Sequence, residues 1–183
     1  MSNLFSRIKA RIKDEQNLDK LVSRGLTIGK NFTRMEGVII DPSHCWHIKI
    51  GDNVVLAPRV HILAHDASTK LFLNYTRVSN TRIGNSVFIG AGSIVLPGIT
   101  IGNNVVIGAG SIVSHDIPDN SVAVGNPARV VKSLQGFIDE RKKEMLSDNV
   151  FGDQYTLRND SFGENERRAL LEACEKYGSV YVK

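Results

Sequence analysis

The sequence has few cysteines and no long apolar run. Cys45 and Cys174 are the two cysteines among 183 residues, too few for a disulfide framework and too isolated for a C-x-x-C metal site. No apolar stretch reaches the roughly 18 residues of a transmembrane helix, and Met1 to Asp14 lacks the apolar block of a signal peptide. These absences predict free thiols, no membrane span and a cytoplasmic location.

Aromatic residues are also scarce, at 7%, and this bears on the meaning of the positive net charge of +4. The basic residues are mixed with acidic ones and form no patch interleaved with aromatic side chains, so we expect no nucleic-acid partner. One basic cluster, within residues 129–143, is placed where it could bind a phosphorylated cofactor.

A six-residue repeat starts at Ile83. Its first position is β-branched and apolar six times in succession, at Ile83, Ile89, Val95, Ile101, Ile107 and Val113. The phrase Ile-Gly-Asn at Ile83 returns 18 residues later at Ile101. Short repeats of this kind are typical of a β-helix, in which each repeat buries its apolar face only when neighbouring repeats stack on it. Three repeats predict one triangular coil.

Glycine fills most of the second positions, and Asn or Asp often follows it. We expect these residues to supply the positive φ angles or the local hydrogen bonds that a tight corner requires. No helical periodicity occurs between Leu26 and Arg129, which argues against a doubly wound α/β fold.

The same register occurs upstream of Ile83. A coil starts at Ile50, but its partner Ile83 lies 33 residues on, which predicts a regular coil of 18 residues with about 15 more looped out within residues 66–82. A weaker coil starts at Ile28 and reaches Ile50 with four residues inserted. The last coil begins near Asp119 and is interrupted at Gly125.

Helices are expected at both ends of the repeats. Leu4, Phe5, Ile8 and Ile12 share one helical face, which predicts a helix over the open end of the first coil. Residues 131–146 are compatible with a helix, and the Ser161–Glu164 spacing of a capping box predicts another that ends at Gly178, followed by a strand in 179–183. The predicted domains are an N-terminal helical segment (1–25), the β-helix (26–131) and a C-terminal helical extension (132–183).

From residue 83 onward the sequence resembles the hexapeptide-repeat acyltransferases. The resemblance rests on the run IGNSVFIGAGSIVLPGITIGNNVVIGAGSIV, on the closing Gly125-Asn126-Pro127-Ala128-Arg129 and on a loop that carries a histidine, and it extends over about residues 26–132. Within that family the chain is most similar to the sugar O-acetyltransferases of the galactoside, maltose and polysaccharide-modifying type. The resemblance implies a mainly β, left-handed parallel β-helix and a homotrimer with active sites between subunits.

The resemblance also implies the chemistry, which is acetyl transfer from acetyl-coenzyme A to a hydroxyl of a sugar or polysaccharide precursor. His65 lies where family members place their catalytic histidine, and an imidazole titrates near the pH at which an alcohol proton must be removed. Asp66, Asp41 and Glu36 are three alternative carboxylates for orienting it. No metal and no acyl-enzyme are expected.

Further residues match the family's binding positions. Ala91 and Ala109 match the small corners along which the pantetheine arm runs, and a backbone N–H near Ala91 is a candidate donor to the oxyanion. The positions that match cofactor contacts or phosphate-binding cations are Ser114, His115, Arg129 and Lys132. The candidate acceptor-binding residues are Glu36, Asp41, His44, Trp46 and Asp66.

Two other interpretations stay open. One is transfer to an amine of a nucleotide-linked amino sugar or an antibiotic, or to serine. The other is a β-helix trimer that is non-enzymatic or uses zinc held by His61 with His44 or His47. The sequence does not identify the acceptor.

Overall fold

The computed structural model describes residues 16–183, and its chain divides into two units at Leu134. The β-helix unit ends at Leu134, and the C-terminal unit covers Gln135–Lys183. The helix expected at Leu4 to Ile12 lies outside the described residues. Among those that are described, no helix combines the length and the apolar character needed to cross a bilayer.

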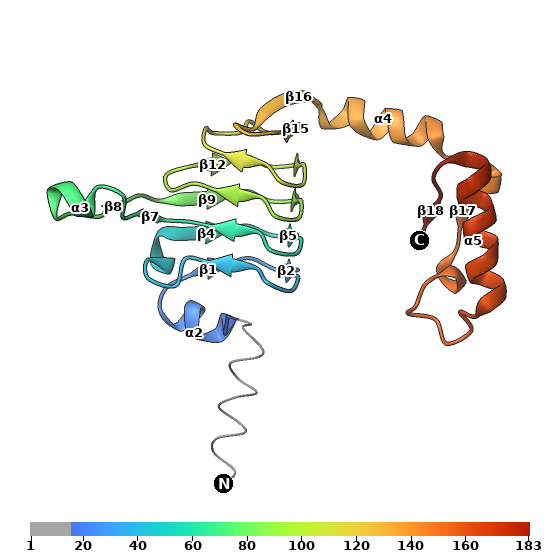
Figure 1. The fold of residues 1–183 in the computed structure, drawn as a ribbon, viewed down its shortest axis with the longest axis horizontal. Helices are drawn as coiled ribbons and strands as arrows, with labels where there is room; N and C mark the ends of the chain where they lie inside the picture. The colour runs from blue at the N-terminus through green and yellow to red at the C-terminus, as the bar shows by residue number, and fades with distance from the viewer. Residues whose placement is uncertain (1–15) are drawn as a thin grey trace, which may run out of the picture. The chain divides into compact units, whose positions relative to one another are not determined.

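Short strands in three parallel sheets form the β-helix unit (Figure 1). The first sheet contains β1 (Thr27–Ile28), β4 (Ile48–Ile50), β9 (Thr81–Ile83) and β12 (Thr100–Ile101). The second contains β2 (Thr33–Arg34), β5 (Val55–Leu56), β10 (Val87–Ile89), β13 (Val105–Ile107), β15 (Ser121–Val124) and the antiparallel β16 (Arg129–Ser133). The third contains β3 (Ile39–Ile40), β6 (His61–Ile62), β11 (Ile94–Val95) and β14 (Ile112–Val113). This arrangement is typical of the left-handed parallel β-helix and confirms the predicted fold class.

The register of the first sheet confirms the predicted coil boundaries. Ile28 pairs with Ile50, Ile50 with Ile83 and Ile83 with Ile101. All six first-position residues from Ile83 to Val113 are buried, and each buried aliphatic side chain contributes about 1.5–3 kcal/mol. The stacked apolar interior therefore holds the coils together.

Glycine and asparagine divide the work at the corners between the first and second sheets in a way that the sequence did not predict. The positive φ angles there belong to residues such as Asn53, Ser86 and Asn104, and not to the second-position glycines. A Cβ on Gly84 would lie 2.5 Å from the carbonyl oxygen of Gly102, so glycine is required for close stacking. The Asn side chains bridge coils, as Asn103 does by accepting the Asn85 N–H at 2.9 Å.

Two insertions interrupt the stack. The four residues inserted before Ile50 form the turn that contains the 3-10 helix η1 (Cys45–His47). The longer insertion is a hairpin in which β7 (His65–Asp66) pairs antiparallel with β8 (Arg77–Val78), with the short helix α3 (Lys70–Leu73) between them. It returns to the first sheet at Thr81, so the predicted loop 66–82 is accurate to about one residue.

The two ends of the stack are built differently. At the start, α2 (Leu18–Ser23) begins after Asn17, whose side chain accepts the Lys20 N–H, and it buries Leu21 against the core. At the other end, the chain folds back at Gly125 and β16 pairs antiparallel with β15. The helix expected from Val131 therefore begins only at Leu134, because residues 129–133 are taken up by the ladder with β15.

The C-terminal unit contains two helices and one small sheet. It comprises α4 (Leu134–Glu144), η2 (Ser147–Asn149), β17 (Val150–Phe151), η3 (Asp153–Tyr155), α5 (Glu164–Tyr177) and β18 (Tyr181–Val182), with β17 and β18 paired in parallel. The predicted Ser161–Glu164 capping box is wrong, because Gly163 precedes the helix and donates its N–H to Glu166 at 2.9 Å. The predicted end at Gly178 is confirmed, with φ of 77°.

Candidate active site

His65 and Asp41 form a hydrogen-bonded pair where two consecutive coils leave the third sheet. Asp41 follows β3, His65 follows β6, and these strands are neighbours in the sheet. Nδ1 of His65 donates to Oδ2 of Asp41. The Asp41 side chain is 0% exposed, whereas that of His65 is 29% exposed. The pairing fixes one ring nitrogen in the protein and leaves Nε2 as the atom that can accept a proton.

The Asp41 carboxylate is saturated with hydrogen bonds. Its Oδ1 accepts the backbone N–H groups of Ser43 and His44, and Oδ2 also accepts the N–H of Ala64 at 3.1 Å. Burial acts to raise the pKa of Asp41, but the hydrogen bonds from His65, Ala64 and Ser43 outweigh it and lower the pKa. Asp41 is therefore ionised at neutral pH. It is the carboxylate, among the three candidates, that contacts His65.

The other two carboxylates lie elsewhere. Asp66 is on the hairpin, where the backbone N–H of Ser68 donates to it at 2.8 Å. That hydrogen bond, followed by the Ser68 hydroxyl and the charge of Arg77, lowers the pKa of Asp66. Glu36 lies at a different corner of the coil, as described below. Asp66 is nonetheless close to the base, because it lines the same cavity as His65.

An aromatic cluster from the η1 insertion lies beside His65. The ring of His44 is 4.8 Å from that of His65 and 5.5 Å from that of Trp46, measured between centroids. Trp46 is 54% exposed. Nδ1 of His44 is buried and has no hydrogen-bond partner within the described part of the chain. Two of the candidate acceptor-binding residues, His44 and Trp46, are thus brought to the predicted base.

An open cavity of about 460 Å³ extends from His65 across neighbouring coils. It is lined by Leu63, His65, Asp66, Ala67, Arg77, Leu96, Pro97, Gly98, Ile99 and Ser114. Most of these residues lie in the turns that leave the third sheet for the first, residues 63–65, 96–98 and 114–116, which we call the histidine corner. The cavity connects the predicted base with Ser114, a predicted cofactor contact.

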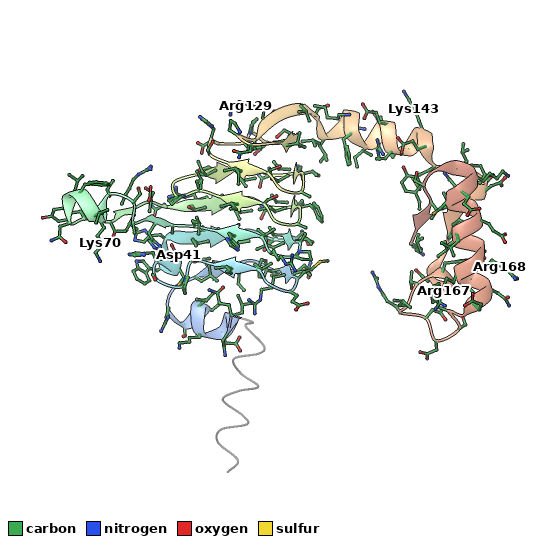
Figure 2. All side chains as sticks on the ribbon, in the orientation of Figure 1. Asp41, Lys70, Arg129, Lys143, Arg167 and Arg168 are labelled. Atoms are coloured by element: carbon green, nitrogen blue, oxygen red, sulfur yellow. The ribbon has the colours of Figure 1, made fainter. Side chains whose placement is uncertain are left out.

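Three predicted cofactor residues meet at the end of the histidine corner. Ser114 Oγ lies 3.0 Å from Nδ1 of His115, and Nη1 of Arg129 lies 3.2 Å from the same nitrogen. Figure 2 shows Arg129 at one end of the stack and Asp41 further along it. Lys132 is in β16, opposite Val122 of the second sheet. The cluster offers a cation and polar groups for an anion.

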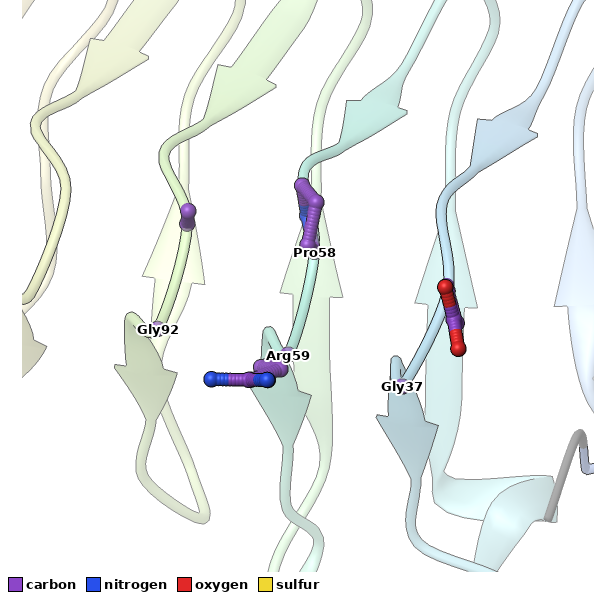
Figure 3. A pocket seen from close by; sticks show the side chains of 6 residues that line it. Gly37, Pro58, Arg59 and Gly92 are labelled. Carbon is purple, nitrogen blue, oxygen red and sulfur yellow. The ribbon is translucent and has the colours of Figure 1, made fainter. Parts of the chain in front are cut away.

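Ala91, Ala109 and Glu36 lie at a different corner. The turns from the second sheet to the third, residues 36–37, 58–59, 91–92 and 109–110, form what we call the glycine corner. Ala91 and Ala109 lie on consecutive coils there, and the Gly110 N–H donates to the Ala91 carbonyl at 2.8 Å. Glu36 and Ala91 line an open groove of about 480 Å³ with Pro58 and Arg59 (Figure 3). The third sheet separates this corner from His65 within one chain.

The structure does not support the zinc site expected from His61. His61 is half-buried on the outer face of β6, whereas His44 and His65 gather with Asp41. The ligand atoms of those three residues lie within 4.8 Å of one another. Both Asp41 oxygens already accept two hydrogen bonds each, which favours a histidine–carboxylate pair over a metal centre.

Three residues of these sites were missed in the sequence. Arg77 lines the cavity because the hairpin register places it opposite Asp66. Asn80 accepts or donates a 2.8 Å hydrogen bond with Nδ1 of His47, which connects the hairpin's return to η1. Arg59 had a signal in the repeat, since it stands at the position that Gly37, Gly92 and Gly110 fill in other coils.

Comparisons with known proteins agree on one family. The sequence profile described as "Bacterial transferase hexapeptide (six repeats)" matches residues 80–115. Protein CapG of Staphylococcus aureus is 39% identical over 143 residues, which cover 75% of this chain and 81% of CapG. Galactoside O-acetyltransferase of Escherichia coli K12 is 43% identical over 111 residues, which cover 58% of this chain and 53% of that enzyme. A maltose O-acetyltransferase from Clostridium difficile 630 has a TM-score of 0.52 and 34% identity, over 70% of this chain and 84% of that structure.

Proposed function

This chain belongs to the hexapeptide-repeat acetyltransferase family, and we propose that it transfers an acetyl group from acetyl-coenzyme A to a hydroxyl of a sugar or polysaccharide precursor. The observation that carries the proposal is the His65–Asp41 pair, which faces a cavity shared with a predicted cofactor contact. The printed activities of the galactoside and maltose enzymes support a sugar hydroxyl as the acceptor.

His65 acts as general base in the proposed reaction. Its Nε2 takes the proton of the acceptor hydroxyl while the oxygen attacks the carbonyl carbon of the thioester. The tetrahedral intermediate then expels the coenzyme A thiolate, which takes the proton back from His65. Ionised Asp41 holds Nδ1–H and stabilises the imidazolium as it forms, so it is a positioning residue. Cys45 is fully buried and no cysteine lies at either corner, which favours direct transfer.

The histidine corner supports a path for the donor. Ser114 is two coils away from His65, because β6, β11 and β14 are successive strands of the third sheet. Two coil spacings amount to about 10 Å. An uncharged pantetheine arm along Leu96 and Gly98 would then carry the thioester to His65, with its phosphates toward His115 and Arg129.

A homotrimer would complete the site. The outward residues of the third sheet are Ile39, His61, Ile94 and Ile112, an apolar face between the histidine and glycine corners. Ile39 is 42% exposed. Burying this face of three copies around one axis would bring the histidine corner of each chain to the glycine corner of its neighbour, where Ala91 and Ala109 would form the opposite wall. We include this assembly in the proposal.

The test is a coenzyme A release assay with acetyl-coenzyme A and a panel of sugars, amino sugars and serine. Transfer to a sugar hydroxyl, with a trimer measured by light scattering, supports the proposal. Transfer only to amines or to serine would move the acceptor class and keep the His65 chemistry. Absence of acetyl-coenzyme A binding by calorimetry would overturn the proposal.

A further inference from the structure

Arg59 has a backbone conformation that its neighbours in the stack leave to glycine. Its φ is +61°, and the matching residues of other coils are Gly37, Gly92 and Gly110, with φ between 68° and 73°. The other non-glycine residues with positive φ in residues 16–183 are five asparagines and Ser86. A left-handed conformation is unfavourable for a long side chain, and such outliers gather at functional sites.

The Arg59 side chain is placed to bind something from outside its own chain. Its stem lies over Gly37, where a Cβ would be 3.1 Å from the Arg59 Cγ. Within the described part of the chain, its guanidinium has no ion pair or side-chain hydrogen bond, although Glu36 lines the same groove. Figure 3 shows the side chain extending on the side of the groove where Gly92 lies. Gly92 and Gly110 leave open space beyond it.

Arg59 and His65 belong to the same coil, at the two ends of β6. In the proposed trimer, Arg59 of one chain would therefore lie at the level of the neighbour's His65. The thioester end of acetyl-coenzyme A carries no charge, and its phosphates would lie at least two coils away, near Arg129. An anion at the level of the base must then belong to the acceptor.

We propose that Arg59 binds a carboxylate or phosphate of the acceptor, so that this enzyme acetylates an anionic saccharide. The inference rests on the proposed function and names its substrate class. A guanidinium forms paired hydrogen bonds with either anion, which gives it both affinity and orientation. The six-residue separation of Arg59 and His65 in the coil would then fix where the modified hydroxyl lies relative to the charge.

The test compares acceptors that differ only in charge. Methyl glucuronoside and methyl galacturonoside are each paired with their uncharged methyl esters, which keep the same hydroxyls, and glucose 1-phosphate is paired with methyl glucoside. For the wild type we expect kcat/KM to favour the charged member at least tenfold. Arg59→Gly should remove this preference, and Arg59→Lys should keep part of it. Lys49→Ala removes an exposed cation from the first sheet and should leave the preference intact.

Arg59→Gly is suited to the test because three glycines already adopt the same φ at this corner. A donor arm compares acetyl-coenzyme A with acetylpantetheine, which lacks the phosphates. If Arg59→Gly raised KM for acetyl-coenzyme A tenfold and left the charge preference unchanged, Arg59 would be a cofactor residue and the proposal would be wrong.

A binding measurement separates this proposal from the proposed function. Ligand-detected NMR with the glucuronoside, the galacturonoside and glucose 1-phosphate needs no turnover. Binding to wild type that is lost in Arg59→Gly supports anion recognition even if no acetyl transfer is found. Acetyl transfer to neutral sugars without any binding of the charged probes overturns anion recognition and leaves the transferase proposal standing.

Discussion

Asp41 accepts the Nδ1 hydrogen bond of His65, a residue 24 positions later in the chain, while its remaining lone pairs bind three backbone N–H groups. The carboxylate is thus fixed by the turn that follows β3 before it contacts the imidazole. A base held in this way loses little freedom when a substrate binds. The predictions for the site follow from this pair and from the way the coils stack.

Replacing His65 with Ala should lower kcat by two to four orders of magnitude, roughly the range for loss of a general base. The fold should persist, because His65 lies outside the apolar interior. Steady-state kinetics with acetyl-coenzyme A and circular dichroism melting measure the two effects. His47→Gln is the histidine control, expected to keep activity within about fivefold because His47 contacts Asn80 and not the base. Near-normal turnover in His65→Ala would exclude His65 as the base.

Asp41→Asn should lower kcat about 10- to 100-fold while KM for acetyl-coenzyme A changes little, since Asp41 orients the base and touches no donor. The amide keeps the size of the side chain but loses the charge that stabilises the imidazolium. The pH dependence of kcat should shift together with its magnitude. A fall in kcat that left the pH profile unchanged would indicate a purely structural role for Asp41.

The stability difference between wild type and Asp41→Asn should depend on pH. The pKa of Asp41 is lowered in the folded protein, so its stabilising contribution is complete above the unfolded-state pKa of about 3.9 and is lost as pH falls through the folded-state pKa. Urea unfolding of both proteins at pH 7, 5, 4 and 3 should give a difference that is constant down to about pH 4 and shrinks below it. Other carboxylates titrate in both proteins and cancel. A difference that stayed the same at pH 3 would contradict the assignment.

Two glycine substitutions should separate steric crowding from backbone strain. In Gly84→Ala the new Cβ would lie 2.5 Å from the Gly102 oxygen, so the coils must move apart, at a cost of about 3 kcal/mol or more in the free energy of unfolding. In Gly110→Ala the Cβ meets open space, and only the φ of 68° opposes it, at about 1–2 kcal/mol. Chemical denaturation measures both. A larger loss in Gly110→Ala would reverse this interpretation.

The sequence predicted the stack because its physics is local and periodic. Ile50 and Ile83 could be paired across 33 residues, since the same apolar position recurs in every coil. The reason for the second-position glycines was wrong, because the contact that excludes a Cβ comes from the next coil and has no signature within a single repeat. The end at β16 was missed because its pairing reverses direction.

The base could be predicted from the sequence, but not its partner. His65 stands where the repeat breaks, whereas three carboxylates were compatible with it until the turn after β3 placed Asp41 against the ring. The distribution of the cofactor residues between two corners also needed the coil geometry. Only the fold reveals that Ala91 and Ser114, 23 residues apart, lie on opposite edges of one sheet.

The reversal at β16 also limits how far the protein can grow. Each parallel coil presents unpaired backbone groups that could template another layer, either from an extended sequence or from the end of a second molecule. An antiparallel edge that carries Arg129 and Lys132 does not offer the register that a further coil needs. This fold-back therefore protects the stack against end-to-end polymerisation into fibres.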